Sequence, residues 1–158
     1  MSEDRRILIL QYIQPGLLGL MDGTVSTLAP LFAVAFATGS PRITFLVGLS
    51  AAIGAAISMG FAEALSDTGV HTERGKPLPR GFITGVMTFL GGIVHTMPFL
   101  LPNMSSALMF AYGIVGLELV AISWVRYHYM SMNFILSLVQ VVIGGGLVVL
   151  SGILIGSS

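Results

Sequence analysis

Residues 15–38 read PGLLGLMDGTVSTLAPLFAVAFAT, and Asp22 is the only charged side chain among them. About 20 apolar residues let a helix cross a hydrocarbon core of about 30 Å, so this run is long enough to span a membrane. The whole chain has the same character, because 54% of its 158 residues are hydrophobic and only 9% are charged. An ordinary soluble domain has about 25% charged residues. The composition therefore predicts a membrane protein.

Four more apolar runs are bounded by polar residues, glycine or proline and are long enough to span, at about 43–65, 81–101, 104–125 and 132–156. Little more than Pro102 and Asn103 separates the third span from the fourth, which predicts a tight antiparallel hairpin. We therefore expect an all-α, polytopic membrane protein with five transmembrane helices, folded as a single membrane domain over residues 1–158.

The basic residues predict an orientation, because Lys and Arg accumulate in short cytoplasmic connections. With a cytoplasmic N-terminus, the outer side holds only Arg42, and the cytoplasmic segments hold Arg5, Arg6, Arg74, Lys76, Arg80 and Arg126. We therefore expect the N-terminus in the cytoplasm and the C-terminus outside.

Charge and cysteine content exclude several classes of protein. The formal net charge is zero, so the basic surface that nucleic-acid binding requires is missing and no nucleic-acid partner is expected. The chain has no cysteine, which excludes a disulfide, a thiolate zinc site and an iron–sulfur cluster. A metal ion would have to be held by oxygen, nitrogen or thioether sulfur.

Asp22 is the candidate for function within the first span. It lies seven residues from Pro15, about 10 Å below the cytoplasmic boundary at 1.5 Å per residue. Insertion scales put an Asp near the centre of a transmembrane helix at about +2.5 to +3.5 kcal/mol, and no Lys or Arg lies at that depth in any span. Protonation would keep the carboxyl uncharged. An acid that is protonated when empty and ionised when it holds a cation is what a proton-coupled carrier needs.

The second span offers further oxygen and sulfur ligands. Met59 falls at nearly the depth of Asp22, and Met59, Glu63 and Asp67 follow at i, i+4 and i+8 on one helix face that leads to the cytoplasm. This face is typical of a path that admits a cation. The alternative is that Met59 only packs and that Glu63 and Asp67 are interfacial residues in water.

Three more polar residues fall within the later spans. Glu118 and Gln140 are each about 10 to 12 Å from the cytoplasmic boundary and could line one cavity. His95 is about 20 Å along from Gly81, in the outer half, where it could pass protons outward. A neutral imidazole hydrogen-bonded between packed helices is an equally good interpretation of His95, and Glu118 could instead be a protonated structural donor or lean toward Arg126.

Small residues recur at helical spacing in the second span, at Gly48, Ala52, Ala55, Ala56 and Gly60. Transmembrane helices approach closely where small residues line the contact. The second helix is therefore expected to be central or to lie at a dimer seam.

Two motifs resemble a known family. Gly19-Leu20-Met21-Asp22-Gly23 and, on the next span, Gly54-Ala55-Ala56-Ile57-Ser58-Met59-Gly60 are similar to the G-L-x-D-G and G-A-x-S-M-G signatures of the vacuolar iron transporter family. The likeness continues through residues 80–82, 91–98 and 118–130 and is greatest to the membrane domain of bacterial erythrin-fused members, also called membrane-bound ferritins.

The resemblance implies a five-helix homodimer in a bacterial inner membrane that moves Fe(II), or else Mn(II), out of the cytoplasm in exchange for protons. It implies Asp22 and Met59 as intramembrane metal ligands, with Glu63 and Asp67 receiving the ion. A two-fold axis would bring together two carboxylates and two thioethers, which suit Fe(II) better than Mg²⁺ or Ca²⁺. The metal is the transported substrate, and no permanently bound cofactor is expected.

Two departures from the family pattern bear on how this chain would obtain iron and on whether it has redox activity. Residues 66–80 offer only Asp67, His71 and Glu73 where eukaryotic-type members insert a long metal-collecting segment. Only 14 residues precede Pro15, where erythrin-fused members carry a di-iron bundle. We therefore expect no redox enzyme activity, and iron is delivered by a separate ferritin-like protein or taken as free cytosolic Fe(II). The alternative functions are a non-transporting membrane scaffold that docks such a partner and a passive divalent cation channel.

Overall fold

The computed structural model describes residues 3–158 and contains five helices, or stacked helical segments, that are long and apolar enough to cross a membrane. These candidate spans are Glu3–Thr38, Pro41–Ser66, Pro77–Val94, Met104–Met130 and Phe134–Gly156. The chain is a multi-pass membrane protein by this criterion. The predicted all-α fold with five spans is confirmed for the part of the chain that the structure describes.

The first span is a stack of helical segments. It runs through α1 (Glu3–Leu8), the π-helical turn η1 (Ile9–Ile13), α2 (Gln14–Ser26) and α3 (Leu28–Thr38). The break at Thr27 has a local cause, since Pro30 has no N–H to donate to the carbonyl of Ser26 and its ring crowds that carbonyl. The first transmembrane helix is therefore divided near its middle, five residues after Asp22.

The second and third spans pack as a pair. Helix α4 (Pro41–Ser66) starts at Ser40, whose side chain accepts a hydrogen bond from the N–H of Ile43. Helix α5 (Pro77–Val94) follows a ten-residue connection and is succeeded by the 3₁₀ turn η2 (Met97–Leu100). The predicted third helix, 81–101, is therefore displaced: α5 starts four residues earlier and ends seven residues earlier, because Pro98 disfavours helix in the residue before it.

The last two spans are α6 (Met104–Met130) and α7 (Phe134–Gly156). Asn103 and Asn133 cap their N-termini by accepting hydrogen bonds from Ser106 and Leu136. Helix α6 stops only at Ser131, which has a left-handed φ of 55°. It is five residues longer than the predicted 104–125, and this length changes the depth of Glu118.

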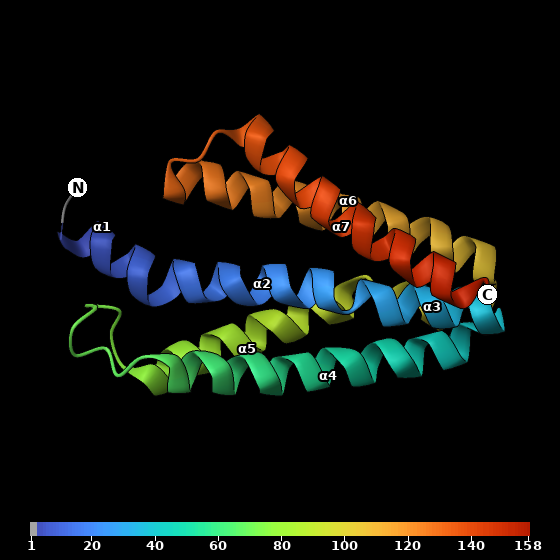
Figure 1. Ribbon diagram of the computed structural model, residues 1–158, viewed down its shortest axis with the longest axis horizontal. Helices are drawn as coiled ribbons and strands as arrows, with labels where there is room; N and C mark the ends of the chain where they lie inside the picture. The colour runs from blue at the N-terminus through green and yellow to red at the C-terminus, as the bar shows by residue number, and fades with distance from the viewer. Residues whose placement is uncertain (1–2) are drawn as a thin grey trace.

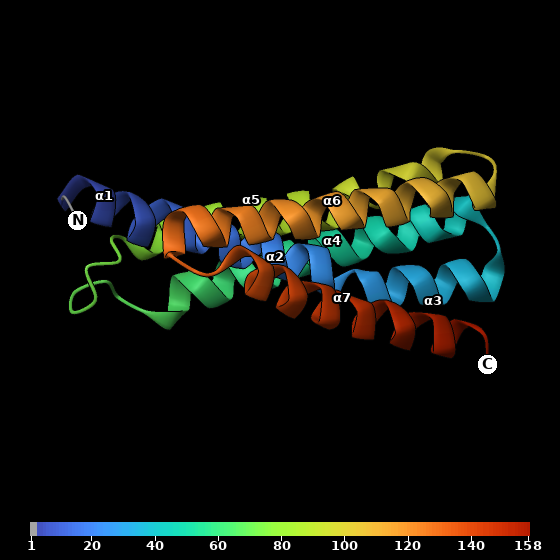
Figure 2. The ribbon, with the colours of Figure 1, turned by 90° about the horizontal axis from the view of Figure 1, so that it is seen from above.

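The helices run up and down between two ends of an elongated bundle (Figure 1). Helix α1, the α4–α5 connection and the α6–α7 turn lie at one end, and the C-terminus lies at the other (Figures 1 and 2). Helix α2 packs on α5, α5 packs on α4, and α7 packs on α3 and α6. Because successive helices run in opposite directions, six of the seven Lys and Arg residues that predicted the orientation lie at the end that carries α1, and Arg42 lies at the other end.

Two glycines of the first motif allow α2 and α5 to touch. A Cβ on Gly19 would lie 2.2 Å from the backbone oxygen of Thr84, and a Cβ on Gly23 would lie 2.0 Å from that of Thr88. Only glycine permits this approach of the two backbones. The glycines on both sides of Asp22 thus have a packing role.

The small residues of α4 are used within the chain. A Cβ on Gly60 would lie 3.1 Å from the backbone oxygen of Gly81 on α5, and Ala52 lies against Gly92. Gly48 faces the side chains of Leu31 and Thr96. Gly48, Ala52 and Gly60 therefore serve close packing within the chain, while α4 as a whole is the least buried of the five spans and keeps an exposed face. Whether that face meets a second chain stays a prediction.

Candidate functional site

Asp22 lies in the last half of α2 and is partly buried. Among residues 3–158, no Lys, Arg or His lies within 4.0 Å of its carboxylate, because the ion pairs of the described chain all involve other acids. Asp22 differs in this respect from Glu63 and Glu118, which both have basic partners. It is the membrane-embedded carboxylate without a fixed counter-charge in the part of the chain that is described.

Met59, the predicted sulfur ligand, is also partly exposed on α4. Helix α4 contacts α2, so Met59 and Asp22 belong to neighbouring helices. The described residues contain no group of three or more His, Asp or Glu side chains that could hold a metal ion. One chain therefore presents a carboxylate and a thioether and lacks a complete coordination shell.

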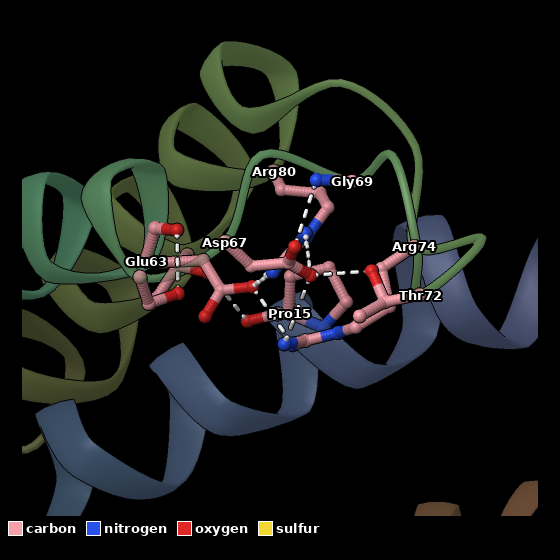
Figure 3. A network of polar contacts seen from close by, with 9 residues as sticks. Pro15, Glu63, Asp67, Gly69, Thr72, Arg74 and Arg80 are labelled. Carbon is pink, nitrogen blue, oxygen red and sulfur yellow. Dashed lines mark hydrogen bonds and ion pairs between the residues drawn. The ribbon is translucent and has the colours of Figure 1, made fainter.

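Glu63 is tied to two arginines at the N-terminal end of the bundle (Figure 3). Arg74 donates to Glu63 Oε1 at 2.9 Å, and Arg80 donates to the same oxygen through Nε at 2.9 Å and through a second contact from Nη2. Both Glu63 and Arg80 are buried, with only 5% and 1% of the side chain exposed. We call Glu63, Asp67, Arg74 and Arg80 the terminal cluster.

Asp67 joins the terminal cluster from outside the helix. Helix α4 ends at Ser66 and Asp67 has an extended backbone, so the predicted i+8 continuation of the Met59 face does not exist. Its carboxylate accepts from the hydroxyl of Thr72 at 2.5 Å, from the N–H of Gly69 at 2.7 Å and from Arg80 at 3.3 Å. The hydrogen bonds from Thr72 and Gly69, followed by that from Arg80, hold the pKa of Asp67 below its ordinary value.

The terminal cluster balances two carboxylates with two guanidinium groups. Arginine stays protonated at any physiological pH and donates in a rigid fork, so these contacts persist. The structure brings Glu63 and Asp67 into one cluster, where arginine nitrogens contact one oxygen of each carboxylate, Glu63 Oε1 and Asp67 Oδ2. A cation at Glu63 would lie beside the positive charges of Arg74 and Arg80, of which Arg74 is the more exposed.

A second buried group lies at the break between α2 and α3. The Nδ1 atom of His95 is 2.9 Å from Oε2 of Glu118, and its Nε2 atom is 2.8 Å from the hydroxyl of Thr27. His95 and Thr27 are fully buried, and the side chain of Glu118 is 10% exposed. We call Thr27, His95 and Glu118 the central cluster.

The contact between His95 and Glu118 joins two residues that the sequence placed at different depths. The sequence placed His95 in the outer half of the membrane and Glu118 about 10 Å from the cytoplasmic side. Helix α6 in fact continues to Met130, so Glu118 is twelve residues, or about 18 Å, from its end. Helix α5 ends at Val94, and His95 follows it directly. Both side chains therefore reach one level near the middle of the bundle.

Gln140 does not join Glu118. It is exposed on α7 and accepts a hydrogen bond from Arg126 at 3.1 Å. Arg126 lies two turns along α6 from Glu118 and uses Gln140 as its partner. The predicted cavity lined by both Glu118 and Gln140, and the predicted contact of Glu118 with Arg126, are not found among the described contacts.

Three residues of these clusters were missed as partners by sequence reasoning. Arg74 and Arg80 were counted only as orientation markers, although their place in the short segment after Glu63 and Asp67 already allowed ion pairs. Thr27 carried a weaker signal, a hydroxyl three residues before Pro30 in an apolar run. A broken helix leaves backbone carbonyls that a nearby hydroxyl can bind.

Comparisons with known proteins add nothing to this geometry: no family model, curated protein or solved structure matches the chain.

Proposed function

We propose that this protein is a proton-coupled exporter of a divalent transition metal, Fe(II) foremost and Mn(II) as the second candidate. The observation that carries the proposal is Asp22, a partly buried carboxylate in the first span that has no basic partner among residues 3–158. An unpaired acid in a transmembrane helix is costly and marks a pathway for an ion or a proton. The resemblance of the two motifs to vacuolar iron transporters supports the same assignment.

Asp22 and Met59 are the proposed metal ligands, supplied by two copies of the chain. A single chain offers one carboxylate and one thioether from the neighbouring helices α2 and α4, too few to replace the water shell of a metal ion. A two-fold homodimer would double this set. The protein would act in a bacterial inner membrane, with the end that carries most of the basic residues in the cytoplasm.

The proposed exchange follows from charge. Asp22 is neutral when it carries a proton and negative when it binds the metal ion. Each transport cycle therefore exchanges protons for a metal ion, and the carboxylate is never left ionised and unpaired in hydrocarbon. Glu63 and Asp67 would guide the ion once Arg74, the more exposed arginine, has moved away and has reduced the positive charge beside them. Fe(II) would arrive free or from a separate iron-delivering protein.

Flux through reconstituted protein tests the proposal. Proteoliposomes are given Fe(II), Mn(II), Co(II) or Zn(II), and pH is recorded on both sides. We expect Fe(II) or Mn(II) to drive proton counterflow, and Asp22→Asn to reduce metal flux at least tenfold, the scale seen when metal sites lose even an indirect contact. Met59→Leu should reduce it less, because the charge of Asp22 remains.

Matched controls are Asp4→Asn, an acid in the first helical turn, and Met109→Leu, an exposed methionine on α6. Both should transport like the wild type. Flux without protons would favour a channel, and no flux with any ion would favour a membrane scaffold. Unchanged flux in both Asp22→Asn and Met59→Leu would mean that these two residues are not the metal ligands.

A further inference from the structure

The hydroxyl of Thr27 has one hydrogen and two acceptors within reach. The carbonyl oxygen of Gly23 is 2.8 Å away, and Nε2 of His95 is also 2.8 Å away. The choice between them decides which nitrogen of His95 carries a hydrogen. The rest of the central cluster follows from that choice.

In the first arrangement, the Thr27 hydroxyl donates to Gly23, as the described hydrogen bond has it. Its oxygen can then only accept from His95, so Nε2 bears a hydrogen. The 2.9 Å contact between Nδ1 and Glu118 Oε2 needs one more proton, since two lone pairs would otherwise face each other. That proton belongs to either atom, and in both cases the pair has no net charge.

In the second arrangement, the Thr27 hydroxyl has turned from Gly23 to His95 Nε2. His95 is then neutral, with its hydrogen on Nδ1, and donates to an ionised Glu118. Counted over the three side chains, the first arrangement has three exchangeable hydrogens and the second has two. The two arrangements therefore differ by one proton and by the direction of one hydroxyl.

The conformation described here fits the proton-loaded arrangement. The other carboxylate oxygen, Glu118 Oε1, is buried and completes no hydrogen bond in this conformation, and the neighbouring hydroxyl of Thr24 is also buried without a partner. An ionised Glu118 would leave part of a negative charge buried at Oε1 without a hydrogen bond unless Thr24 turned to donate to it, which makes ionisation costly here. Loss of the proton therefore requires the Thr27 hydroxyl to turn from Gly23 to His95.

We infer that the central cluster is an intramembrane proton-binding site, in which Thr27 switches between Gly23 and His95 as Glu118 and His95 release one proton. The site is separate from Asp22 and lies five residues beyond it along the same span. The proton site follows from the contacts of the cluster alone. Its use as a proton carrier of the exporter rests on the proposed function.

Other ionisable groups make no described hydrogen bond or ion pair with His95 or Glu118. Helices α3 and α7 contain none. The remaining ones on the packed helices are Asp22 on α2, Arg42 and Glu63 on α4, Arg80 on α5, and Tyr112, Arg126, Tyr127, His128 and Tyr129 on α6, the last three at nine or more residues from Glu118. Glu63, Arg80 and Arg126 have other partners, and Asp22 and Tyr112 make no described hydrogen bond to the pair. His95 and Glu118 are thus each other's ionisable partners.

The tautomer of His95 tests the inference on purified protein, with no transport required. Nitrogen NMR of ¹⁵N-histidine protein in detergent reads which ring nitrogen carries hydrogen, and His71 and His128, both exposed, are internal references. We expect Nε2 of His95 to be protonated at neutral pH and the hydrogen to move to Nδ1 at high pH. A hydrogen on Nδ1 alone at neutral pH, or no change over the pH range in which the protein stays folded, would overturn the inference.

Variants identify the partners. Glu118→Gln resembles the loaded form, because its amide N–H₂ can donate to Nδ1, so His95 should keep its hydrogen on Nε2 at every pH. Thr27→Ala should shift the midpoint of the tautomer change by about one pH unit or more, and Thr27→Ser should restore it. Tyr112→Phe, on the same helix as Glu118, should leave the titration unchanged. A wild-type titration in Glu118→Gln, or equal midpoints in Thr27→Ala and Thr27→Ser, would contradict the assignment.

Proteoliposomes separate this inference from the proposed function. We expect Glu118→Gln to lose proton counterflow that accompanies metal flux in the wild type. If Glu118→Gln keeps the proton counterflow of the wild type, the central cluster does not carry the exchanged proton, and the proposed exporter function stands. If the wild type shows the tautomer change but moves no metal ion, the exporter function is wrong, and the central cluster is still a proton-binding site.

Discussion

The terminal and central clusters each neutralise a buried glutamate, but they use different bases. Glu63 faces Arg74 and Arg80, and Glu118 faces His95. Arginine does not lose its proton in a protein, whereas histidine exchanges one near physiological pH. The residues of the terminal cluster therefore stay charged whether or not they are in contact, while the central cluster can gain or lose a proton. Glutamate thus forms a permanent ion pair at the end of the bundle and a proton-binding site in its middle.

Asp22 completes this comparison as the acid without a base. It lies in the same span as Thr27, and the described residues give it no Lys, Arg or His partner. Three membrane-embedded carboxylates thus have three environments: permanent counter-charge, exchangeable counter-charge and none. Only the last leaves the carboxylate without competition from a basic side chain, which is why we propose Asp22 as the metal ligand.

The largest effect is expected from breaking the terminal cluster. Glu63→Gln leaves the buried guanidinium of Arg80 beside a neutral amide oxygen, with Asp67 at 3.3 Å as its remaining counter-charge, so we expect a loss of about 3 kcal/mol in the free energy of unfolding. Reversible unfolding in mixed micelles measures this loss. Ala62→Gln, at the exposed neighbouring position of α4, controls for the introduction of an amide. A loss below that of the control would show that Arg80 does not depend on Glu63.

Breaking the charge of the central cluster should cost less stability. The amide of Glu118→Gln can still donate to His95 Nδ1, so the free energy of unfolding should change by less than about 1.5 kcal/mol, the value of one hydrogen bond. The same unfolding measurement applies. A loss equal to that of Glu63→Gln would mean that Glu118 and His95 form a permanent ion pair, and the contrast between the clusters would disappear.

Arg74 sharpens the comparison within the terminal cluster. Its side chain is 29% exposed and its pair with Glu63 is screened by solvent, so Arg74→Gln should cost about 1 kcal/mol or less. Added salt should reduce the difference from wild type further. Unfolding at low and high ionic strength measures both quantities. A cost as large as that of Glu63→Gln would identify Arg74, instead of Arg80, as the main partner of Glu63.

The smallest effect concerns Asp67 and pH. Its folded-state pKa is below the unfolded value of about 3.9, so the folded protein binds this proton more weakly than the unfolded chain does. The stabilisation is complete above the unfolded pKa and is lost as pH falls through the folded pKa. The difference in melting temperature between wild type and Asp67→Asn should therefore narrow below about pH 4. A constant difference down to the lowest pH at which the protein folds would show that Asp67 acts by some other means.

The sequence predicted the spans well and the polar contacts poorly. Apolar run length alone located five helices, because crossing hydrocarbon requires every backbone group to be satisfied inside one helix. Helix ends depended on single residues: Pro98 shortened α5, and α6 continued through Arg126 and His128 to Met130. A shift of a few residues at a helix end moves every side chain on it in depth. For this reason the sequence placed His95 and Glu118 at different depths, although their side chains are in contact.

The sequence by itself determined that this chain is a five-span membrane protein, that Asp22 is an acid in an apolar helix, and that Gly19 and Gly23 flank it. These are local properties of composition and spacing. Only the tertiary structure decided which acids have partners, because the pairs of Glu63 with Arg80 and of His95 with Glu118 join residues on different helices. Close packing of glycine-lined helices brings those helices together, and the energy of a charge in a membrane depends on what lies within a few ångströms of it.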